Sequence, residues 1–205
     1  MIEVKMAVIG CGKWGMNHVR TASKLFDKDL KYCSDNSSEN EKKVKEISGD
    51  IIFTTDTGKI INDESIRAVI VSTPAETHFD ITRELLLAGK NVLVEKPITL
   101  NSGEAKELNI IAEEKGLTLM VGHLLLYHPA ILKIKEYIES GELGNLQYIY
   151  SNRLNLGTIR TEENILWSFA PHDISVIQYF TGSIPEEVTA TGAIFVQKDI
   201  QDTTL

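Results

Sequence analysis

Short apolar runs alternate with stretches of helical periodicity through residue 122 of the chain. The apolar runs are rich in Val, Ile and Leu and mostly lack strict polar alternation, which is typical of strands covered on both faces. Regular alternation of strands and helices predicts parallel strands joined by right-handed crossovers, and hence a doubly wound α/β sheet. The predicted strands are Lys5–Gly10, Leu30–Asp35, Asp50–Asp56, Ala68–Pro74, Asn91–Pro97 and Leu117–His123. The predicted helices are Lys13–Phe26, Ser38–Ile47, His78–Ala88 and Ser102–Lys115, with a short helix or loop at Thr57–Ser65.

Two of these helices carry start and stop signals in the sequence. Gly89 and Gly116 follow the last periodic residues of the third and fourth helices, where a left-handed residue commonly ends a helix. Asn101, followed three residues later by Glu104, resembles a capping box at the start of the fourth helix.

The pattern changes after His123, which predicts a second α/β or α+β unit. We therefore expect one domain over residues 1–122 and another over residues 123–205. The second is predicted to contain helices at Pro129–Ser140 and Trp167–Phe180, strands at Asn145–Leu154 and Glu187–Val196, a loop at Gly157–Asn164 and the approach to a further strand at Asp199–Leu205.

Composition narrows the class of protein. The 205 residues include 21 basic and 29 acidic ones, so the formal net charge is −8. This balance, without any basic run, argues against nucleic acid or an anionic membrane as the main partner. No apolar stretch approaches the roughly 18 residues of a membrane span, and the N-terminus lacks a signal-peptide pattern. Two cysteines, Cys11 and Cys33, form neither a disulfide framework nor a Cys-x-x-Cys pair. We expect a soluble, cytoplasmic, globular protein.

The first predicted strand leads directly into the pattern Gly-x-Gly-x-x-Gly. In such a turn Gly10 permits the tight bend, Gly12 lets the backbone approach a pyrophosphate, and Gly15 allows close packing of helix on strand. The helix that follows directs backbone N–H groups at the phosphates. The motif therefore predicts a dinucleotide-binding Rossmann domain, although a methyltransferase or an FAD protein stays open from this segment alone. The spacing excludes a Walker A phosphate loop.

Asp35 lies 20 residues after the third glycine, at the end of the second predicted strand. A carboxylate there accepts hydrogen bonds from the adenosine ribose hydroxyls and repels a 2′-phosphate. No Arg or Lys follows directly to reverse this preference. The sequence thus favours NAD over NADP.

Several chemically active residues follow the later strands, at the sheet edge where open α/β folds bind ligands. Thr73-Pro74 with His78 follows the fourth strand, Glu95-Lys96 ends the fifth, and His123 ends the sixth. Adjacent Glu and Lys at the end of an apolar strand are either a solvated ion pair or a catalytic lysine beside its cofactor.

Taken in order, four segments resemble the Gfo/Idh/MocA family of oxidoreductases, the relatives of glucose–fructose oxidoreductase and inositol dehydrogenase. The resemblance implies a Rossmann domain followed by an open mixed sheet that covers the active site and builds homo-oligomers. It also implies that Lys96 contacts the nicotinamide ribose and the substrate hydroxyl, and that the bond before Pro97 is often cis. The four segments are Gly10-x-Gly12-x-x-Gly15, Thr73-Pro74-x-x-x-His78, Glu95-Lys96-Pro97 and Met120-Val121-Gly122-His123. The cofactor-binding residues expected from motif and resemblance are Gly10, Gly12, Lys13, Trp14, Gly15, Asp35, Thr73, Pro74, His78, Glu95 and Lys96.

The resemblance places the second catalytic residue, a general base, at His172. The family has an Asp four residues earlier, but this chain has Ser168 there. A serine hydroxyl can orient the imidazole without adding charge. Asp173 is an uncertain substitute, because it projects about 100° away around a helix.

The region around residues 153–167 looks most like the branch of the family that acts on nucleotide sugars. Its arginines suit a diphosphate or a carboxylate, since guanidinium binds such anions bidentately, but surface arginines are equally expected. The five histidines show no metal-ligand spacing, so no metal site is predicted. The candidate substrate residues are His123, Arg153, Asn155, Arg160 and Trp167.

Together these features predict an NAD-dependent oxidoreductase that transfers hydride between nicotinamide and a secondary hydroxyl of a sugar or nucleotide sugar. The alternative is a non-catalytic dinucleotide- or metabolite-binding protein on the same fold, suggested by Ser168 and by the early stop at Leu205. Because a sheet cut there exposes a strand edge, we expect a truncated family member or one completed by a partner subunit.

Overall fold

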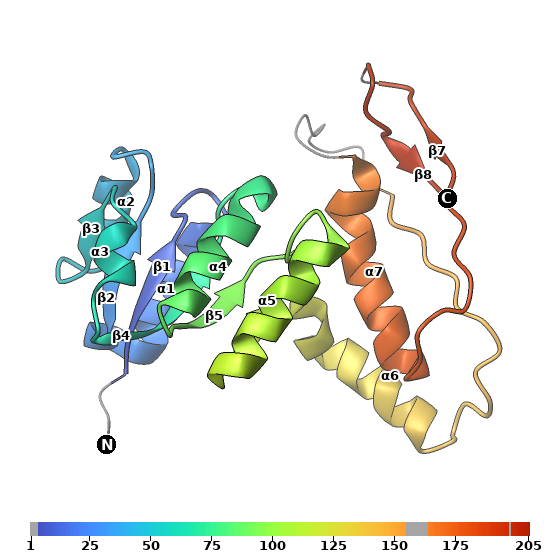
Figure 1. Ribbon diagram of the computed structural model, residues 1–205. Coiled ribbons are helices and arrows are strands. Elements are labelled where there is room, and N and C mark those ends of the chain that lie inside the picture. The colour runs from blue at the N-terminus through green and yellow to red at the C-terminus, as the bar shows by residue number, and fades with distance from the viewer. Residues whose placement is uncertain (1–3, 155–163, 197) are drawn as a thin grey trace. The chain divides into compact units, whose positions relative to one another are not determined.

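The computed structural model describes residues 4–154, 164–196 and 198–205, so the predicted loop at Gly157–Asn164 lies almost entirely outside the described residues. The chain divides into two compact units, Met1–Gly122 and His123–Leu205. The elements of the first unit, seen in Figure 1, are β1 (Lys5–Ile9), α1 (Gly15–Phe26), β2 (Leu30–Ser34), α2 (Asn40–Ile47), β3 (Ile52–Thr54), α3 (Gly58–Ile61), β4 (Ile66–Val71), α4 (His78–Leu87), β5 (Asn91–Val94), α5 (Ser102–Lys115) and β6 (Leu119–Val121).

The first unit is built on one six-stranded sheet in the order β3-β2-β1-β4-β5-β6. Every pair in it is parallel. This is the strand order of dinucleotide-binding Rossmann folds, in which the chain reverses direction across the sheet between β1 and β4. The predicted doubly wound sheet is thereby confirmed.

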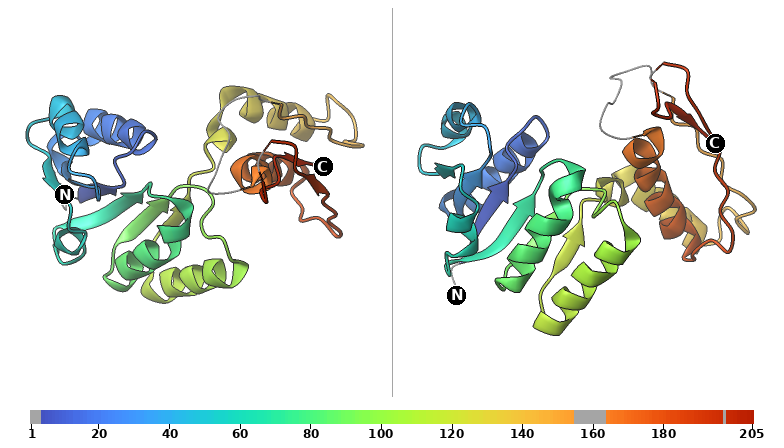
Figure 2. Two further views of the ribbon diagram at one scale, coloured as in Figure 1. Left: turned by 90° about the horizontal axis from the view of Figure 1, so that it is seen from above. Right: turned by 45° about the horizontal axis from the view of Figure 1, so that its top comes forward.

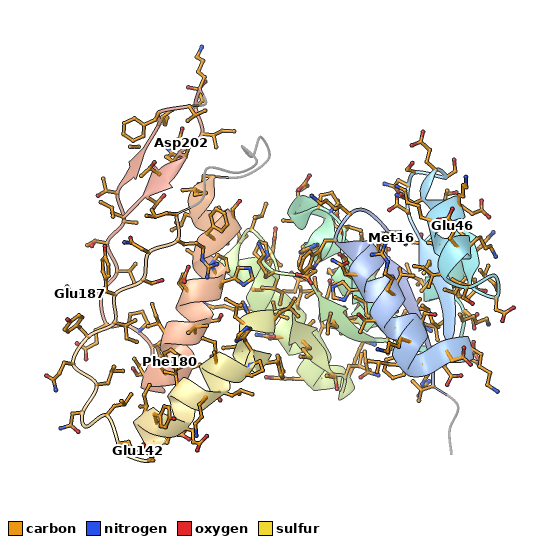
Figure 3. The ribbon with its side chains drawn as sticks, turned by 180° about the vertical axis from the view of Figure 1, so that it is seen from behind. Met16, Glu46, Glu142, Phe180, Glu187 and Asp202 are labelled. Atoms are coloured by element: carbon orange, nitrogen blue, oxygen red, sulfur yellow. The ribbon has the colours of Figure 1, made fainter. Side chains whose placement is uncertain are left out.

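Helices cover both faces of this sheet (Figure 2): α1 and α2 lie on one face, and α3, α4 and α5 on the other. Alternate side chains of β1 pack on opposite faces of the sheet, because successive side chains of a strand point in opposite directions. Val8 packs with Met16 of α1, which Figure 3 labels, whereas Ile9 packs in the cluster of Leu85 and Leu108 from α4 and α5. The two-sided burial explains the continuous apolar runs of these strands.

The predicted helix caps are present, but Asn101 forms no capping box with Glu104, because its N–H donates to Thr99 Oγ1 at 3.4 Å instead. Gly89 and Gly116 have φ angles of +77° and +62°, the left-handed conformation that glycine adopts without a steric cost. The Asn101 side chain accepts a hydrogen bond from the Gly103 N–H at 2.7 Å and so caps α5.

Among its described residues, the second unit contains two α-helices, α6 (Pro129–Glu139) and α7 (Ile165–Thr181), and a short 3-10 helix at Leu124–Tyr127. The Lys135 Nζ of α6 donates a hydrogen bond to the carbonyl oxygen of Phe180. Figure 3 labels Phe180 near the end of α7. The described strands are short: β7 (Gly192–Ala193) pairs antiparallel with β8 (Thr203–Thr204).

The strand predicted at Asn145–Leu154 was wrong, and the strand predicted at Glu187–Val196 was correct only in part. Residues 145–154 form no strand, and only Gly192–Ala193 of the predicted Glu187–Val196 is paired. Residues 145–154 are all exposed, with Tyr148 and Tyr150 at 83% and 79%, so their side chains pack against no sheet face among the described residues. Among the described residues, no helix is both long and apolar enough to cross a membrane.

Candidate functional site

The glycine-rich turn lies where β1 meets its neighbour β4. Gly10 has a φ of +90°, and a Cβ on it would lie 2.4 Å from the carbonyl oxygen of Ser72. A Cβ on Gly15 would lie 1.9 Å from the carbonyl oxygen of Gly10. Neither approach is compatible with a side chain, so two of the three glycines are required by the packing of helix and strands around the turn.

Gly12 differs from these two, because nothing lies within 4 Å of the position of its Cβ. Gly12 and Lys13 are exposed, and Trp14 is 52% exposed. The middle of the turn thus presents open backbone at the start of α1, as a pyrophosphate-binding site requires.

Asp35 is tied directly to this turn. Its Oδ2 accepts the Cys11 N–H at 2.7 Å, and its Oδ1 accepts the Ser37 N–H at 2.9 Å. These bonds fix the carboxylate beside the turn at the carboxyl end of β2, where a ribose would lie. Open glycine backbone and an oriented carboxylate together fit an adenine dinucleotide.

Glu95, directly after β5, accepts three hydrogen bonds at its carboxylate. Its Oε1 accepts hydrogen bonds from Trp14 Nε1 at 2.8 Å and from His18 Nε2 at 2.7 Å. Its Oε2 accepts the backbone N–H of Lys96 at 3.2 Å. Glu95 is 7% exposed, and these donors compensate the loss of water around its charge.

These contacts set the charge of Glu95. Burial alone raises the pKa of its carboxyl, but the hydrogen bonds from His18 and Trp14 outweigh it, so the pKa lies below its ordinary value. Gly122 closes the other side, since a Cβ there would lie 3.1 Å from the carboxylate atoms. The group is therefore held ionised in a tight enclosure.

His78, the first residue of α4, lies between two backbone carbonyls and is 1% exposed. Its Nδ1 lies 2.7 Å from the Pro97 oxygen and its Nε2 lies 2.9 Å from the Thr73 oxygen. The ring therefore links the Thr73-Pro74 loop to the chain after Lys96. Its part in binding the cofactor stays a prediction. The Lys96–Pro97 peptide bond is cis, as the resemblance implies.

Two further contacts complete this edge of the first unit. The Cys11 thiol lies 3.5 Å from the Ser34 carbonyl oxygen, within hydrogen-bond distance for sulfur. A hydrogen bond with Cys11, together with burial, raises the pKa of the Cys33 thiol. Both cysteines are buried as free thiols, and a protonated, buried thiol is a poor nucleophile.

In the second unit, His172 lies on α7 one turn after Ser168, which is 5% exposed. The carboxylate of Asp173 accepts three hydrogen bonds: its Oδ2 accepts from Arg153 Nε at 2.8 Å, and its Oδ1 accepts from Arg153 Nη2 at 3.1 Å and Ser151 Oγ at 3.0 Å. The Arg153 guanidinium lowers the pKa of the Asp173 carboxyl. Arg153 and Ser151 therefore bond Asp173 directly, and His172 adds a weaker electrostatic attraction that also lowers the pKa of its carboxyl.

The remaining candidates are placed as follows. Lys96 and His123 are partly buried, and Trp167, in the first turn of α7, is 38% exposed. Asn155 and Arg160 lie outside the described residues. Across the described ranges, no group of three or more His, Cys, Asp or Glu side chains is arranged to hold a metal ion.

Sequence reasoning missed His18 as part of the site. A signal was present, because His18 lies four residues after Trp14 and so on the same side of the chain once it turns into α1. Both side chains reach the same oxygen of Glu95.

Comparison with known proteins agrees with this geometry. The family described as "Oxidoreductase family, NAD-binding Rossmann fold" matches residues 4–123, and the GFO/IDH/MocA C-terminal domain matches residues 131–205. The uncharacterized oxidoreductase YrbE of Bacillus subtilis is 28% identical, over 95% of this chain and 58% of its own length. The scyllo-inositol 2-dehydrogenase (NAD(+)) of the same organism is 27% identical, over 94% of this chain and 58% of its own length.

UDP-N-acetylglucosamine 3-dehydrogenase of Acidithiobacillus ferrooxidans is 27% identical, over 96% of this chain and 60% of its own length. Its solved structure matches with a TM-score of 0.85 and 28% identity, covering 100% of this chain and 64% of that one. The chain thus spans about 60% of the length of these curated relatives. With an NAD-binding Rossmann unit whose glycines, Asp35 and Glu95 are arranged as described, the chain belongs to the Gfo/Idh/MocA family of oxidoreductases.

Proposed function

We propose that the protein oxidises a secondary hydroxyl of a sugar or nucleotide sugar with NAD. The observation that supports this most directly is the position of Lys96. It follows β5 and Glu95, and Glu95 is bonded to Trp14 of the glycine-rich turn. An ammonium group beside a dinucleotide site is suited to hold a reacting hydroxyl.

In this proposal each residue of the chain has a defined task. Lys96 donates a hydrogen bond to the substrate oxygen and stabilises the negative charge that develops on it. His172 accepts the hydroxyl proton as general base. Bound NAD supplies the hydride acceptor. Gly12, at the open centre of the turn, and Asp35 hold the pyrophosphate and the ribose.

The substrate class rests on the relatives, which include an inositol dehydrogenase and a UDP-N-acetylglucosamine dehydrogenase. Both act on rings that carry secondary hydroxyls. We propose Arg153, Asn155, Arg160, Trp167 and His123 as substrate residues. A substrate anion at Arg153 has to compete with Asp173, which already holds the guanidinium by two bonds.

The test is NADH formation with a panel of sugars, inositols and UDP-sugars, comparing the wild type with Lys96→Ala. We expect turnover with at least one ring substrate and its loss in Lys96→Ala, while calorimetry still shows NAD binding. Lys106→Ala, on α5, is the matched control and keeps wild-type turnover. Unchanged turnover in Lys96→Ala would refute this role of Lys96.

One observation favours a second candidate function, a dinucleotide- or metabolite-binding protein without catalysis. Ser168 stands where the resemblance implies a carboxylate beside His172, and Asp173 is bonded to Arg153 and Ser151. A protein of this kind binds NAD but reduces it with no member of the panel. A cytoplasmic location and a homo-oligomer stay predictions.

A further inference from the structure

We propose that Glu95 is a positioning residue that couples the glycine-rich turn to Lys96, with Trp14 and His18 as its two donors. The inference rests on the proposed function, in which Lys96 contacts the reacting hydroxyl. It assigns His18, which neither motif nor resemblance assigned, a task in that reaction.

The directions of the hydrogen bonds are fixed by chemistry. An ionised carboxylate only accepts, and an indole nitrogen only donates. His18 must therefore carry hydrogen on Nε2 to bond with Glu95 Oε1 at 2.7 Å. The same oxygen receives Trp14 Nε1 at 2.8 Å, so two donors from the start of α1 converge on one atom.

The second oxygen of the Glu95 carboxylate, Oε2, links the glycine-rich turn to Lys96. Glu95 Oε2 accepts the backbone N–H of Lys96, the first atom of the proposed catalytic residue. Gly122 leaves about 3.1 Å between its Cβ position and the carboxylate, so the group has little room for another orientation. A carboxylate with both oxygens engaged and no space to rotate transmits the position of Trp14 to Lys96.

Trp14 is the residue through which a dinucleotide bound at the glycine-rich turn affects Glu95. It lies between Gly12, where the backbone is open, and Gly15, whose packing against Gly10 fixes the start of α1. A dinucleotide at the turn restrains the backbone of Trp14, and thereby favours the indole orientation that bonds Glu95. By linkage, ordering of Glu95 and Lys96 favours NAD binding to the same degree.

The experiment measures hydrogen exchange of the backbone segment 91–100, with and without NAD, alongside NAD affinity by calorimetry. Trp14→Phe keeps an aromatic side chain but removes the indole N–H donor, and His18→Phe removes the second donor. His18→Gln retains a side-chain N–H and serves as the conservative rescue. Arg20→Gln, on an exposed position of the same helix, is the matched control.

In the wild type we expect NAD to slow exchange at Lys96. In Trp14→Phe and His18→Phe this slowing falls about tenfold, as expected for loss of a hydrogen bond to a charged group. His18→Gln restores most of it, and Arg20→Gln leaves it unchanged. With an active substrate, the Phe variants lower kcat more than they raise the KM for the sugar.

The outcomes separate this inference from the proposed function. NAD-dependent protection of Lys96 that is equal in both Phe variants and in the control overturns the coupling, even if the enzyme is active. If the wild type reduces no substrate, the proposed function fails, yet the exchange experiment still decides the coupling. Should a Phe variant not fold, Gly122→Ala crowds the carboxylate from the other side with both donors intact. Unchanged Lys96 protection in that variant overturns the coupling equally.

Discussion

The Nδ1 atom of His78 lies 2.7 Å from the carbonyl oxygen of Pro97, so the first residue of α4 holds the main chain directly after Lys96. The other ring nitrogen lies 2.9 Å from the carbonyl oxygen of Thr73. One buried side chain thus joins the loops that follow β4 and β5.

Replacing this histidine by alanine is expected to lower the free energy of unfolding of the first unit by about 2–4 kcal/mol, because a backbone carbonyl loses the imidazole N–H that donates to it and a cavity is left. Urea unfolding followed by Trp14 fluorescence, in a Trp167→Phe background, measures the effect. Glu84→Ala, on an exposed position of the same helix, should change stability by no more than about 0.5 kcal/mol. Equal stabilities for the two variants would contradict the structural role of His78.

The glycines of the turn should respond differently to the same added methyl group. Gly15→Ala places a Cβ 1.9 Å from the Gly10 oxygen and should cost about 2 kcal/mol or more of stability. Gly12→Ala meets nothing within 4 Å, so stability should stay within about 0.5 kcal/mol. NAD affinity should nevertheless fall about tenfold or more in Gly12→Ala, because the methyl group blocks the approach of the pyrophosphate. Unfolding curves and NAD titrations of both variants check this; full NAD affinity in Gly12→Ala would place the pyrophosphate elsewhere.

The charge on Glu95 predicts a pH dependence of stability. Its pKa is lowered in the folded protein from an ordinary value of 4.5, so the ionised group stabilises the fold above about pH 4.5. That contribution is lost as the pH falls below 4.5 through the lowered pKa. Glu95→Gln should therefore be less stable than the wild type by about 1–3 kcal/mol near neutral pH. The difference should shrink as the solution is acidified below pH 4.5; a gap that is constant from pH 7 to pH 3 is the contrary result, measured by urea unfolding at each pH.

The Arg153–Asp173 pair should contribute modestly to the second unit. The Arg153 side chain is 37% exposed, so solvent screens the attraction and a coupling energy of about 0.5–1 kcal/mol is expected. A double-mutant cycle with Arg153→Gln and Asp173→Asn, followed by Trp167 fluorescence in a Trp14→Phe background, measures it. The coupling should weaken at high salt. A coupling energy of zero at low salt would show that the bidentate contact between Arg153 and Asp173 adds nothing to stability.

The sheet was predictable because its strands are buried on both faces, and each therefore carries a continuous apolar signal that needs no knowledge of its neighbours. The end of α5 at Gly116 was equally predictable, since the left-handed conformation that ends a helix depends on the local sequence alone. The conformation of Asn145–Leu154 was not predictable in this way. A segment becomes a strand only where another strand lies beside it and pairs with it, and the local sequence does not reveal such a partner. The tyrosines of this segment are exposed in the described part of the second unit instead.

The candidate site was predicted in part for the same reason. Its glycines and Asp35 belong to a motif with fixed spacing, which sequence alone reveals. The role of His18 depends on Glu95, 77 residues later, and on the way β5 lies beside the start of α1. The contact between His18 and Glu95 depends on the order of the strands in the sheet, so it could be identified only from the structure.

The enclosure of Glu95 also bears on how the protein is made. His18 and Trp14 leave the ribosome early, but Gly122, which closes the carboxylate, is the last residue of the first unit to be synthesised. Until β6 pairs with β5, the nascent chain has an unpaired edge on β5, and Gly122 does not yet lie against the carboxylate of Glu95. Stalled or prematurely ended products that lack β6 therefore keep this strand edge exposed, which favours their capture by chaperones.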